Sequence, residues 1–398
     1  KDVDAQGREA LFNITRLRRD FGTSSFAGLT LTDRSLLDGG DYNRVAAADV
    51  RVVFGGLYYA EAQLGGAWTR DALGTRGDAL WKLDLDRTGR SWGFHYSLNG
   101  MGDDFVTRSG FVNRTGIVSA RAFNRLSAYG ARGALVESFT AFFGPNRIWR
   151  YDSFGRESAI EGGESINLML RLRGGWELSS ELQRDFVALD PIDYAGITTS
   201  VADGFVPYVP LDEVSGPSLR LQASTPTFQS FDANVELRRA RVAIFAEGSE
   251  GDAWIASAGL STRPAPWIRL NATGSYQRIT RARDDSEFAH AFIPRVLAAV
   301  QPSRALLFRV ITEYRAERLT ALEDAHTGAP LLRDGEPITA SDNNGLQVDV
   351  LAAWEPSPGT VAYLGYGSTL AGEDGATLGE LERLRDGFFL KLAYQFRW

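Results

Sequence analysis

The chain contains no cysteine, and only three of its 398 residues are lysines. The absence of thiols excludes disulfides, cysteine nucleophiles and thiolate metal sites. No apolar run reaches the length of about 18 residues that a transmembrane helix needs. The 50 acidic and 43 basic residues give a formal net charge of −7. This balance argues against a nucleic-acid-binding protein, which needs a basic field.

Turn-forming and aromatic residues are abundant, with 42 Gly, 9 Trp, 13 Tyr and 23 Phe. Many segments alternate apolar and polar residues with a period of two, as in FFLKLAYQFRW at 388–398. Such a period places the two sets on opposite faces of a β-strand. The alternating segments run for about 10–16 residues, whereas strands of soluble proteins average about five or six. The lengths suit tilted strands that cross a bilayer.

Connections between the segments vary in length along the chain in a regular way. Short ones are expected near 22–24, 55–56, 87–90, 129–132, 174–175, 263–266, 301–303 and 356–359. Longer ones are expected near 35–42, 70–77, 102–112, 149–160, 187–216, 318–344 and 370–384. Tight turns at one end of a sheet and loops at the other are typical of outer-membrane barrels. The sequence therefore predicts an all-β fold: one transmembrane antiparallel β-barrel domain over 1–398, with about 18–20 strands.

In this barrel one face of each strand meets lipid and the other faces the lumen. The lipid-facing set is predicted to include Trp81, Leu83, Leu85, Trp92, Phe94, Tyr96, Phe396 and Trp398. The lumen-lining set is predicted to include Glu61, Lys82, Asp84, Asp86, His95, Arg171, Arg173, Glu177, Glu181, Arg220, Arg269, Glu313, Asp349 and Lys391. Charges of both signs could pair and stiffen the wall, or could line a water-filled path.

Five stretches resemble one family of proteins. They are ITRLRRDFGTSSFAGLTLTDR (14–34), NRVAAADVRVVF (43–54), SGFVNRTGI (109–117), WEPSPGTVAYLGYG (354–367) and FFLKLAYQFRW (388–398). The family is the bacterial outer-membrane β-barrel of unknown function that usually follows a carbohydrate-binding family 9-like domain. The resemblance covers most of 8–398 and implies a location in the bacterial outer membrane. It also implies further barrel strands upstream, so this chain is expected to lack part of a barrel wall. It supplies no catalytic residues.

The three histidines, His95, His290 and His326, fit no metal motif. His95 is expected to be a hydrogen-bonded lumen side chain, and Ser97 on the same strand face lacks a third group to complete a nucleophile and base. No phosphate-binding loop, Gly-x-Ser-x-Gly elbow or His-Glu-x-x-His helix occurs. The sequence thus predicts no catalytic residues, no metal and no cofactor. Acidic pairs such as Glu323-Asp324 are expected to bind cations weakly at most.

The leading hypothesis for function is a porin-like channel or transport pore with a mixed-charge lumen. The alternatives are a membrane anchor that displays a binding module and, less favoured, an outer-membrane enzyme. The expected partners are outer-membrane lipid and small solutes. The apolar, proline-bearing loop 187–216 could instead plug the lumen or bind a protein partner.

Overall fold

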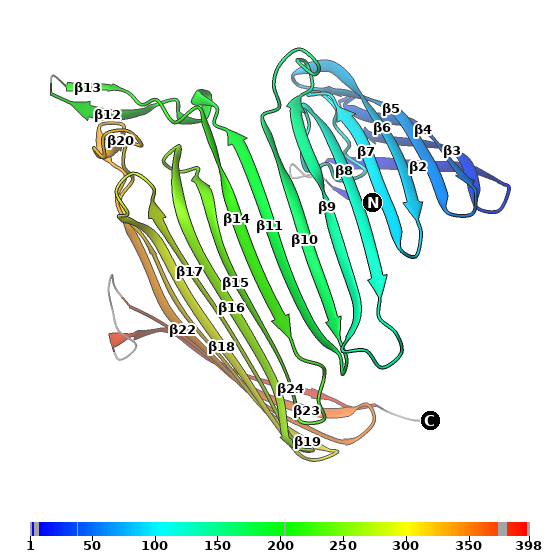
Figure 1. The fold of residues 1–398 in the computed structure, drawn as a ribbon. Coiled ribbons are helices and arrows are strands. Elements are labelled where there is room, and N and C mark those ends of the chain that lie inside the picture. Colours follow the sequence, from blue (N-terminus) through cyan, green and yellow to red (C-terminus); the bar gives the residue numbers. More distant parts are fainter. Residues whose placement is uncertain (1, 4–7, 38, 203, 373–379, 396–398) are drawn as a thin grey trace. The chain divides into compact units, whose positions relative to one another are not determined.

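A computed structural model describes residues 2–3, 8–37, 39–202, 204–372 and 380–395 (Figure 1). Within these residues the elements are β-strands and one short 3-10 helix, η1 (Pro191–Tyr194). No helix in the described part of the chain is long and apolar enough to cross a membrane. The chain divides into two compact units, residues 1–128 with 140–167 and residues 129–139 with 168–398.

The first unit is an antiparallel series in which each strand from β2 to β8 pairs with the next along the chain. A two-residue strand, β1, pairs with the start of β2. The strands are β1 (Asp2–Val3), β2 (Glu9–Phe21), β3 (Ser25–Leu36), β4 (Tyr42–Phe54), β5 (Tyr58–Asp71), β6 (Gly74–Thr88), β7 (Trp92–Met101) and β8 (Ile117–Tyr129). Two further strands, β9 (Val136–Arg150) and β10 (Glu161–Leu172), contribute residues to both units.

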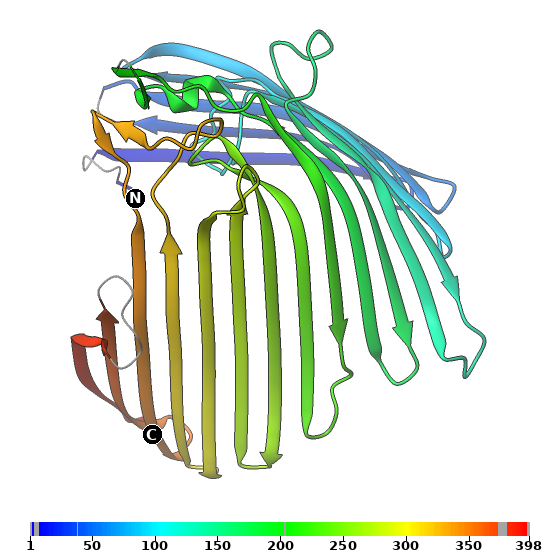
Figure 2. The same cartoon turned by 60° about the vertical axis from the view of Figure 1, so that its left-hand side comes forward.

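The second unit contains ten long strands that also pair antiparallel in chain order. They are β11 (Trp176–Ala188), β14 (Glu213–Ser224), β15 (Phe231–Ile244), β16 (Ser249–Ala265), β17 (Ile268–Arg281), β18 (Glu287–Ser303), β19 (Leu306–Leu319), β22 (Ser341–Ser357), β23 (Thr360–Gly372) and β24 (Glu382–Ala393). Figure 2 shows the green to orange strands side by side, with tight hairpins at one end.

A separate four-stranded sheet in the second unit has the order β13-β12-β20-β21. Its strands are β12 (Ile197–Val201), β13 (Gly204–Pro207), β20 (Leu331–Arg333) and β21 (Glu336–Pro337). Segments 187–216 and 318–344, predicted to be loops, therefore contain strands and the helix η1. We call residues 189–212 and 320–340 together the cap. Its strands were missed because they are short and pair with each other across a long stretch of chain.

The predicted fold class is confirmed in the described residues, where the long antiparallel series and β1 make 20 strands, against about 18–20 expected. The long strands span 10 to 17 residues. Whether further strands complete the wall, and whether 1–398 forms one domain, stay predictions.

One predicted connection is wrong. The segment 70–77 is no long loop, because β5 and β6 are joined only by residues 72 and 73. The Asp71 carboxylate accepts a hydrogen bond from the Leu73 N–H at 3.0 Å, and Gly74 adopts a φ of +106°. Both features favour a tight turn.

The apolar faces of the long strands are exposed. Leu64 is 64% exposed, Leu83 52% and Leu364 55%, although each lies within a strand. A core of buried apolar side chains lies instead around the cap and the ends of the neighbouring strands; it includes Leu189, Tyr194, Tyr208, Phe288 and Leu331. A sheet that exposes such a large apolar face in water would aggregate, whereas a bilayer stabilises that face.

Candidate functional site

The polar strand faces carry most of the charge, and in the first unit the charges gather where β5, β6 and β7 pair. Glu61 lies opposite Asp84, and Asp86 lies opposite His95. The Lys82 ammonium lies 2.7 Å from Asp84 and 3.3 Å from Glu61. We call these five residues the β5–β7 cluster. The structure thus brings together the five predicted lumen residues of the first unit.

The two sides of His95 face acids in the β5–β7 cluster. Its Nδ1 lies 3.4 Å from Asp86, and its Nε2 lies 4.0 Å from Asp84. Asp84 is only 7% exposed, and its Oδ1 has no hydrogen-bond partner among the described residues. In the described part of the chain, no three acidic or histidine side chains are placed to hold a metal ion. The arrangement suits a hydrogen-bonded polar wall.

The opposite faces of the same strands are apolar. Leu83 lies opposite Ala62 and Leu98, and Leu85 lies opposite Ala60 and Tyr96. Near the turns the rings of Phe94 and Tyr96 stack 4.6 Å apart, and Trp92 packs on Phe94 at 5.6 Å. The segregation predicted for Trp81, Leu83, Leu85, Trp92, Phe94 and Tyr96 is therefore present, and their contact with lipid stays a prediction. Phe396 and Trp398 lie outside the described residues.

The long connection between β7 and β8, residues 102–116, folds back onto the polar face of β4 and β5. The Asn43 amide donates to the carbonyl of Val106 and to Thr69 Oγ1, each at 2.8 Å, and its oxygen accepts the Arg108 N–H at 2.8 Å. Asn43 and Thr69 are completely buried as a result, and Phe105 is 3% exposed. We call residues 102–116 the in-folded loop.

Acidic side chains hold the in-folded loop in place at its other contacts. The Arg108 guanidinium lies 3.2 Å from Asp71, which also binds Arg76 at 2.9 Å. The Asp104 N–H donates to Asp78 Oδ2 at 3.3 Å. The sequence predicted a long connection at 102–112 and a plug at 187–216, but not that residues 102–116 fold onto the wall. The polar Asn43 on β4 was the one feature of the sequence that pointed to this contact.

In the second unit most predicted lumen charges bind a neighbour on the same wall. Arg220 lies between Glu181 at 3.3 Å and Glu236 at 3.6 Å. Arg171 binds Glu177, and Glu313 lies 3.5 Å from Arg315. Arg173 donates to the carbonyl of Gly133 at 3.1 Å, and Lys391 lies opposite Tyr363 on β23. The ion pairs among these contacts are partly exposed, so each stabilises the wall by about 0–1 kcal/mol.

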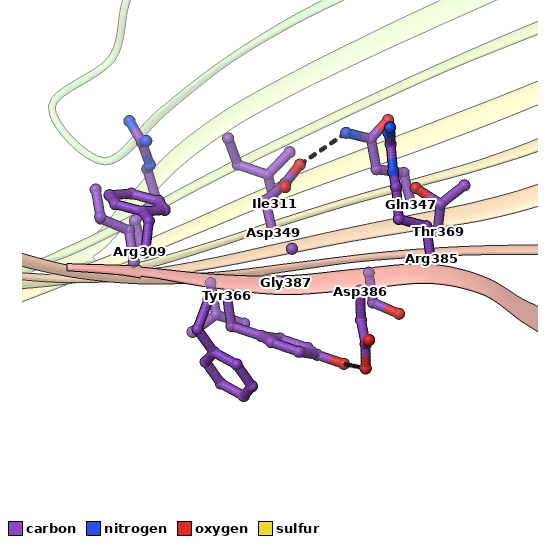
Figure 3. A pocket seen from close by; sticks show the side chains of 15 residues that line it. Arg309, Ile311, Gln347, Asp349, Tyr366, Thr369, Arg385, Asp386 and Gly387 are labelled. Atoms are coloured by element: carbon purple, nitrogen blue, oxygen red, sulfur yellow. Dashed lines mark hydrogen bonds between the residues drawn. The ribbon is translucent and has the colours of Figure 1, made fainter.

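A pocket of about 450 Å³ lies around β19, β22, β23 and β24, and Figure 3 shows the side chains that line it. Arg309, Asp349, Gln347 and Arg385 lie on one side of the β24 ribbon in this view, and Tyr366 and Asp386 lie on the other. The Gln347 amide donates to Asp349 at 3.0 Å. Asp349 lies opposite Gly367, which in turn lies opposite Gly387. The wall is therefore thin beside Asp349, because neither neighbour has a side chain.

A second pocket, of about 470 Å³, lies over β16 to β19 and includes the predicted residue Arg269. Arg263 and Arg309 also line it, with Asn271 and Gln301. Among the residues that the structure describes, no carboxylate lies within ion-pair distance of Arg263, Arg269 or Arg309. Arg269 is thus a predicted lumen residue that lacks the wall partner its counterparts have.

A buried ion pair that the sequence did not predict lies at the strand ends that contact the cap. Both side chains of Glu247 and Arg281 are buried, and Arg281 Nε lies 3.0 Å from Glu247 Oε1. Arg281 also donates to the carbonyls of Glu287 and Ala321 at 3.1 and 2.8 Å. The Glu323 N–H donates to Glu247 Oε1 at 3.0 Å. The pair joins the end of β17 to the β15–β16 turn and to the cap segment 320–340, so its role is structural.

Groups of the protein itself bind both carboxylates of the acidic pair Glu323-Asp324. Arg283 lies 2.5 Å from Glu323, and Asp324 Oδ1 accepts the N–H groups of His326 and Thr327 at 2.8 and 2.9 Å. Burial alone would raise the pKa of Asp324, but these hydrogen bonds outweigh it and lower the pKa. Weak cation binding at most is also expected at two further acidic clusters, Asp38 with Asp41 and Glu373-Asp374. Of these residues, Asp38, Glu373 and Asp374 lie outside the described residues.

No family model matches the chain, and no curated protein matches it. Similar solved structures are outer-membrane proteins of Vibrio cholerae. They are in-vitro folded OmpT (9% identity, TM-score 0.38, 84% of this chain and 94% of that chain), its loop L8 deletion mutant (10%, 0.36, 78% and 93%) and the trimer form of OmpT (9%, 0.34, 85% and 97%).

The likeness is one of strand architecture alone, and no residue role transfers at this identity. The outer-membrane location predicted for this chain rests on its own long alternating strands and exposed apolar faces. The resemblance to the barrel family that follows a carbohydrate-binding domain stays a prediction.

Proposed function

We propose that the chain forms the wall of an outer-membrane pore that passes small hydrophilic solutes. The in-folded loop is the observation that carries this proposal. It lies on the charged strand face and is fixed there by Asn43, while the other strand face is apolar and exposed. A loop held against the inner wall of a barrel narrows the water-filled path but leaves it open. The charged face then lines that path, and outer-membrane lipid covers the apolar face.

Conductance across a planar bilayer tests this function. The folded protein should give steady ion current, and deletion of residues 104–112 within the in-folded loop should raise the unit conductance. Asn43→Ala, which removes the three hydrogen bonds of the anchor, should give a noisier current with frequent steps. The matched control Asn99→Ala lies on the same polar face, opposite Lys82, and should keep the parent conductance. A correctly folded protein that carries no current in any of these forms would refute the pore.

A non-enzymatic role is part of the proposal. Ser97 lies opposite Asp84 in the strand register, and no hydrogen bond joins Ser97 to His95 among the described residues. A serine nucleophile needs an adjacent base. The β5–β7 cluster therefore supports a role in lining the path. Ser97→Ala should leave conductance unchanged. If any hydrolytic activity is measured for the parent protein, Ser97→Ala should retain it.

A second candidate function is the display of a binding surface, and the tip of the cap favours it. Phe205 is 62% exposed on β13 and Val209 is 60% exposed just after it. The neighbouring Tyr208 is buried in the core, so the segment that carries the exposed residues is held in place by packing. A protein partner at 187–216 would bury these apolar side chains. Phe205→Ser should leave conductance unchanged and abolish capture of such a partner.

A further inference from the structure

Three arginines surround one patch of the polar wall in the second unit, close to the tight turns. Arg269 on β17 and Arg309 on β19 both lie opposite Ala299, which occupies the strand between them. Residues directly opposite each other share a face, so both guanidinium groups stand on either side of a small side chain. Arg263, at the end of β16, lines the same pocket of about 470 Å³. All three arginines are exposed.

No ion pair neutralises the charge of this patch in the described residues, although Asp349 lines the neighbouring pocket of about 450 Å³ together with Arg309. Other wall arginines have carboxylate partners, as Arg220 does in Glu181 and Glu236. In the described part of the chain, Arg263, Arg269 and Arg309 form no ion pair. Arginine stays protonated at any ordinary pH, so three like charges line the pocket permanently. A counterion in the pocket relieves their mutual repulsion.

The other lining groups fit an oxyanion. Ser261 Oγ lies 3.0 Å from the side-chain oxygen of Asn271 and donates to it, which leaves the Asn271 NH₂ group to donate into the pocket. Gln301 adds a second amide. Guanidinium groups bind phosphate oxygens in pairs, with a geometry that an ammonium group cannot match. Leu297 and Ala299, on the same face, provide a small apolar floor.

We propose that Arg263, Arg269 and Arg309 form a binding site for a phosphate-bearing solute, either inorganic phosphate or an organic phosphomonoester. The inference rests on the proposed pore, because only in a pore would this site bind anions along a water-filled path. The same chemistry is offered by a lipid phosphate, but the site lies on the polar strand face, and a soluble phosphate is the ligand we assign.

Direct binding to the folded full chain in detergent tests the site without reference to conductance. Calorimetric titration with inorganic phosphate should show saturable binding that Arg269→Gln and Arg309→Gln each weaken by about tenfold, the effect of losing one charged hydrogen bond. Arg295→Gln is the matched control. This variant also removes one arginine charge from the polar wall face, but on β18, where Arg295 lies 3.9 Å from Glu313. It should leave phosphate binding within about twofold of the parent. Heat-dependent gel mobility establishes that each variant is folded.

The outcomes separate the site from the pore. Phosphate binding that the two pocket variants lose and the control keeps would support the site, whether or not the protein conducts. Absence of phosphate binding in the folded parent protein, or equal loss in the control, would overturn it. Binding to phosphatidylglycerol nanodiscs that Arg269→Gln weakens, without binding to inorganic phosphate, would assign the site to lipid and overturn the soluble ligand. If the protein conducts, phosphate should block the parent channel and spare the Arg269→Gln channel.

Discussion

Arg281 Nε lies 3.0 Å from Glu247 Oε1 at a place where the two side chains are 3% and 1% exposed. Such a pair is costly to break, because removal of one partner leaves an uncompensated buried charge. Arg281→Met should therefore destabilise the cap by about 3–5 kcal/mol. Native-state cleavage by chymotrypsin within 189–212 measures this change.

Two further variants test the cause of this loss. The double variant Glu247→Met with Arg281→Met should be less destabilised than either single one, since no unpaired charge remains. Arg278→Met breaks the exposed 3.0 Å pair with Glu287 and should cost less than about 1 kcal/mol. Equal effects at Arg281 and Arg278 would contradict the assignment of a buried ion pair.

The turn between β15 and β16 has room only for glycine. Gly248 has a φ of +58°, and a Cβ there would lie 2.4 Å from the Cβ of Pro210 and 3.0 Å from the Tyr194 ring. Gly248→Ala should destabilise the cap by about 1–3 kcal/mol, measured as faster chymotrypsin cleavage. Gly274→Ala is the control, because a Cβ there meets nothing within 4 Å. Resistance of both variants to cleavage would refute the close packing.

Alkaline pH should loosen the cap through Tyr208. Burial raises the pKa of its hydroxyl to about 12. In the unfolded chain a tyrosine ionises near pH 10, so the unfolded state loses a proton first as the pH rises. The stability that the neutral Tyr208 contributes is present below about pH 10 and is lost between about pH 10 and 12.

Cleavage rates of the cap at several alkaline pH values measure this effect. The rate should climb through the window from about pH 10 to 12. Tyr208→Phe keeps the ring and removes the ionising group, so its rate should rise less steeply. Tyr194 also has a raised pKa because of burial, and it accounts for the slope that persists. Identical slopes for the parent and Tyr208→Phe would rule out this origin.

Contact of the apolar strand face with lipid can be tested at Leu83. Leu83→Arg should destabilise the folded state by about 2–4 kcal/mol if the residue lies near the bilayer midplane. Ser97→Arg introduces the same residue on the polar face, opposite Asp84, and should be tolerated. Urea unfolding from lipid vesicles, followed by heat-dependent gel mobility, compares the two. A tolerated Leu83→Arg with an intolerant Ser97→Arg would reverse the two faces.

The period-two pattern was enough to predict the long strands and the separation of polar and apolar residues on their two faces. Lys82, Asp84 and Asp86 alternate with apolar neighbours, and their common face follows from geometry alone. Their contacts with Glu61 and His95 depend on strand register, which the turns at 72–73 and 89–91 set. The tight turn at 72–73 was missed because its signal is one side-chain hydrogen bond, from the Leu73 N–H to Asp71.

Longer-range contacts were out of reach of the sequence. The Glu247–Arg281 pair joins residues 34 positions apart, and Asn43 contacts Val106 across 63 positions. Each depends on a loop that folds back onto strands already in place. Local alternation carries no information about where such a loop returns. The unpaired state of Arg269 was hidden for the same reason, because it depends on which residues the neighbouring strands place beside it.

The cap also constrains the order in which the chain can fold. The Ala325 N–H donates to Tyr208 Oη at 3.4 Å across 117 positions, and β12 pairs with β20 across a similar stretch of chain. The intervening strands β14 to β19 pair only with near neighbours in sequence. Contacts of high sequence separation form late, because closing a long chain costs entropy before any contact repays it. We therefore expect the cap to close after β14 to β19 have paired, so that protease resistance at Tyr208 during biogenesis marks the completion of their hairpins.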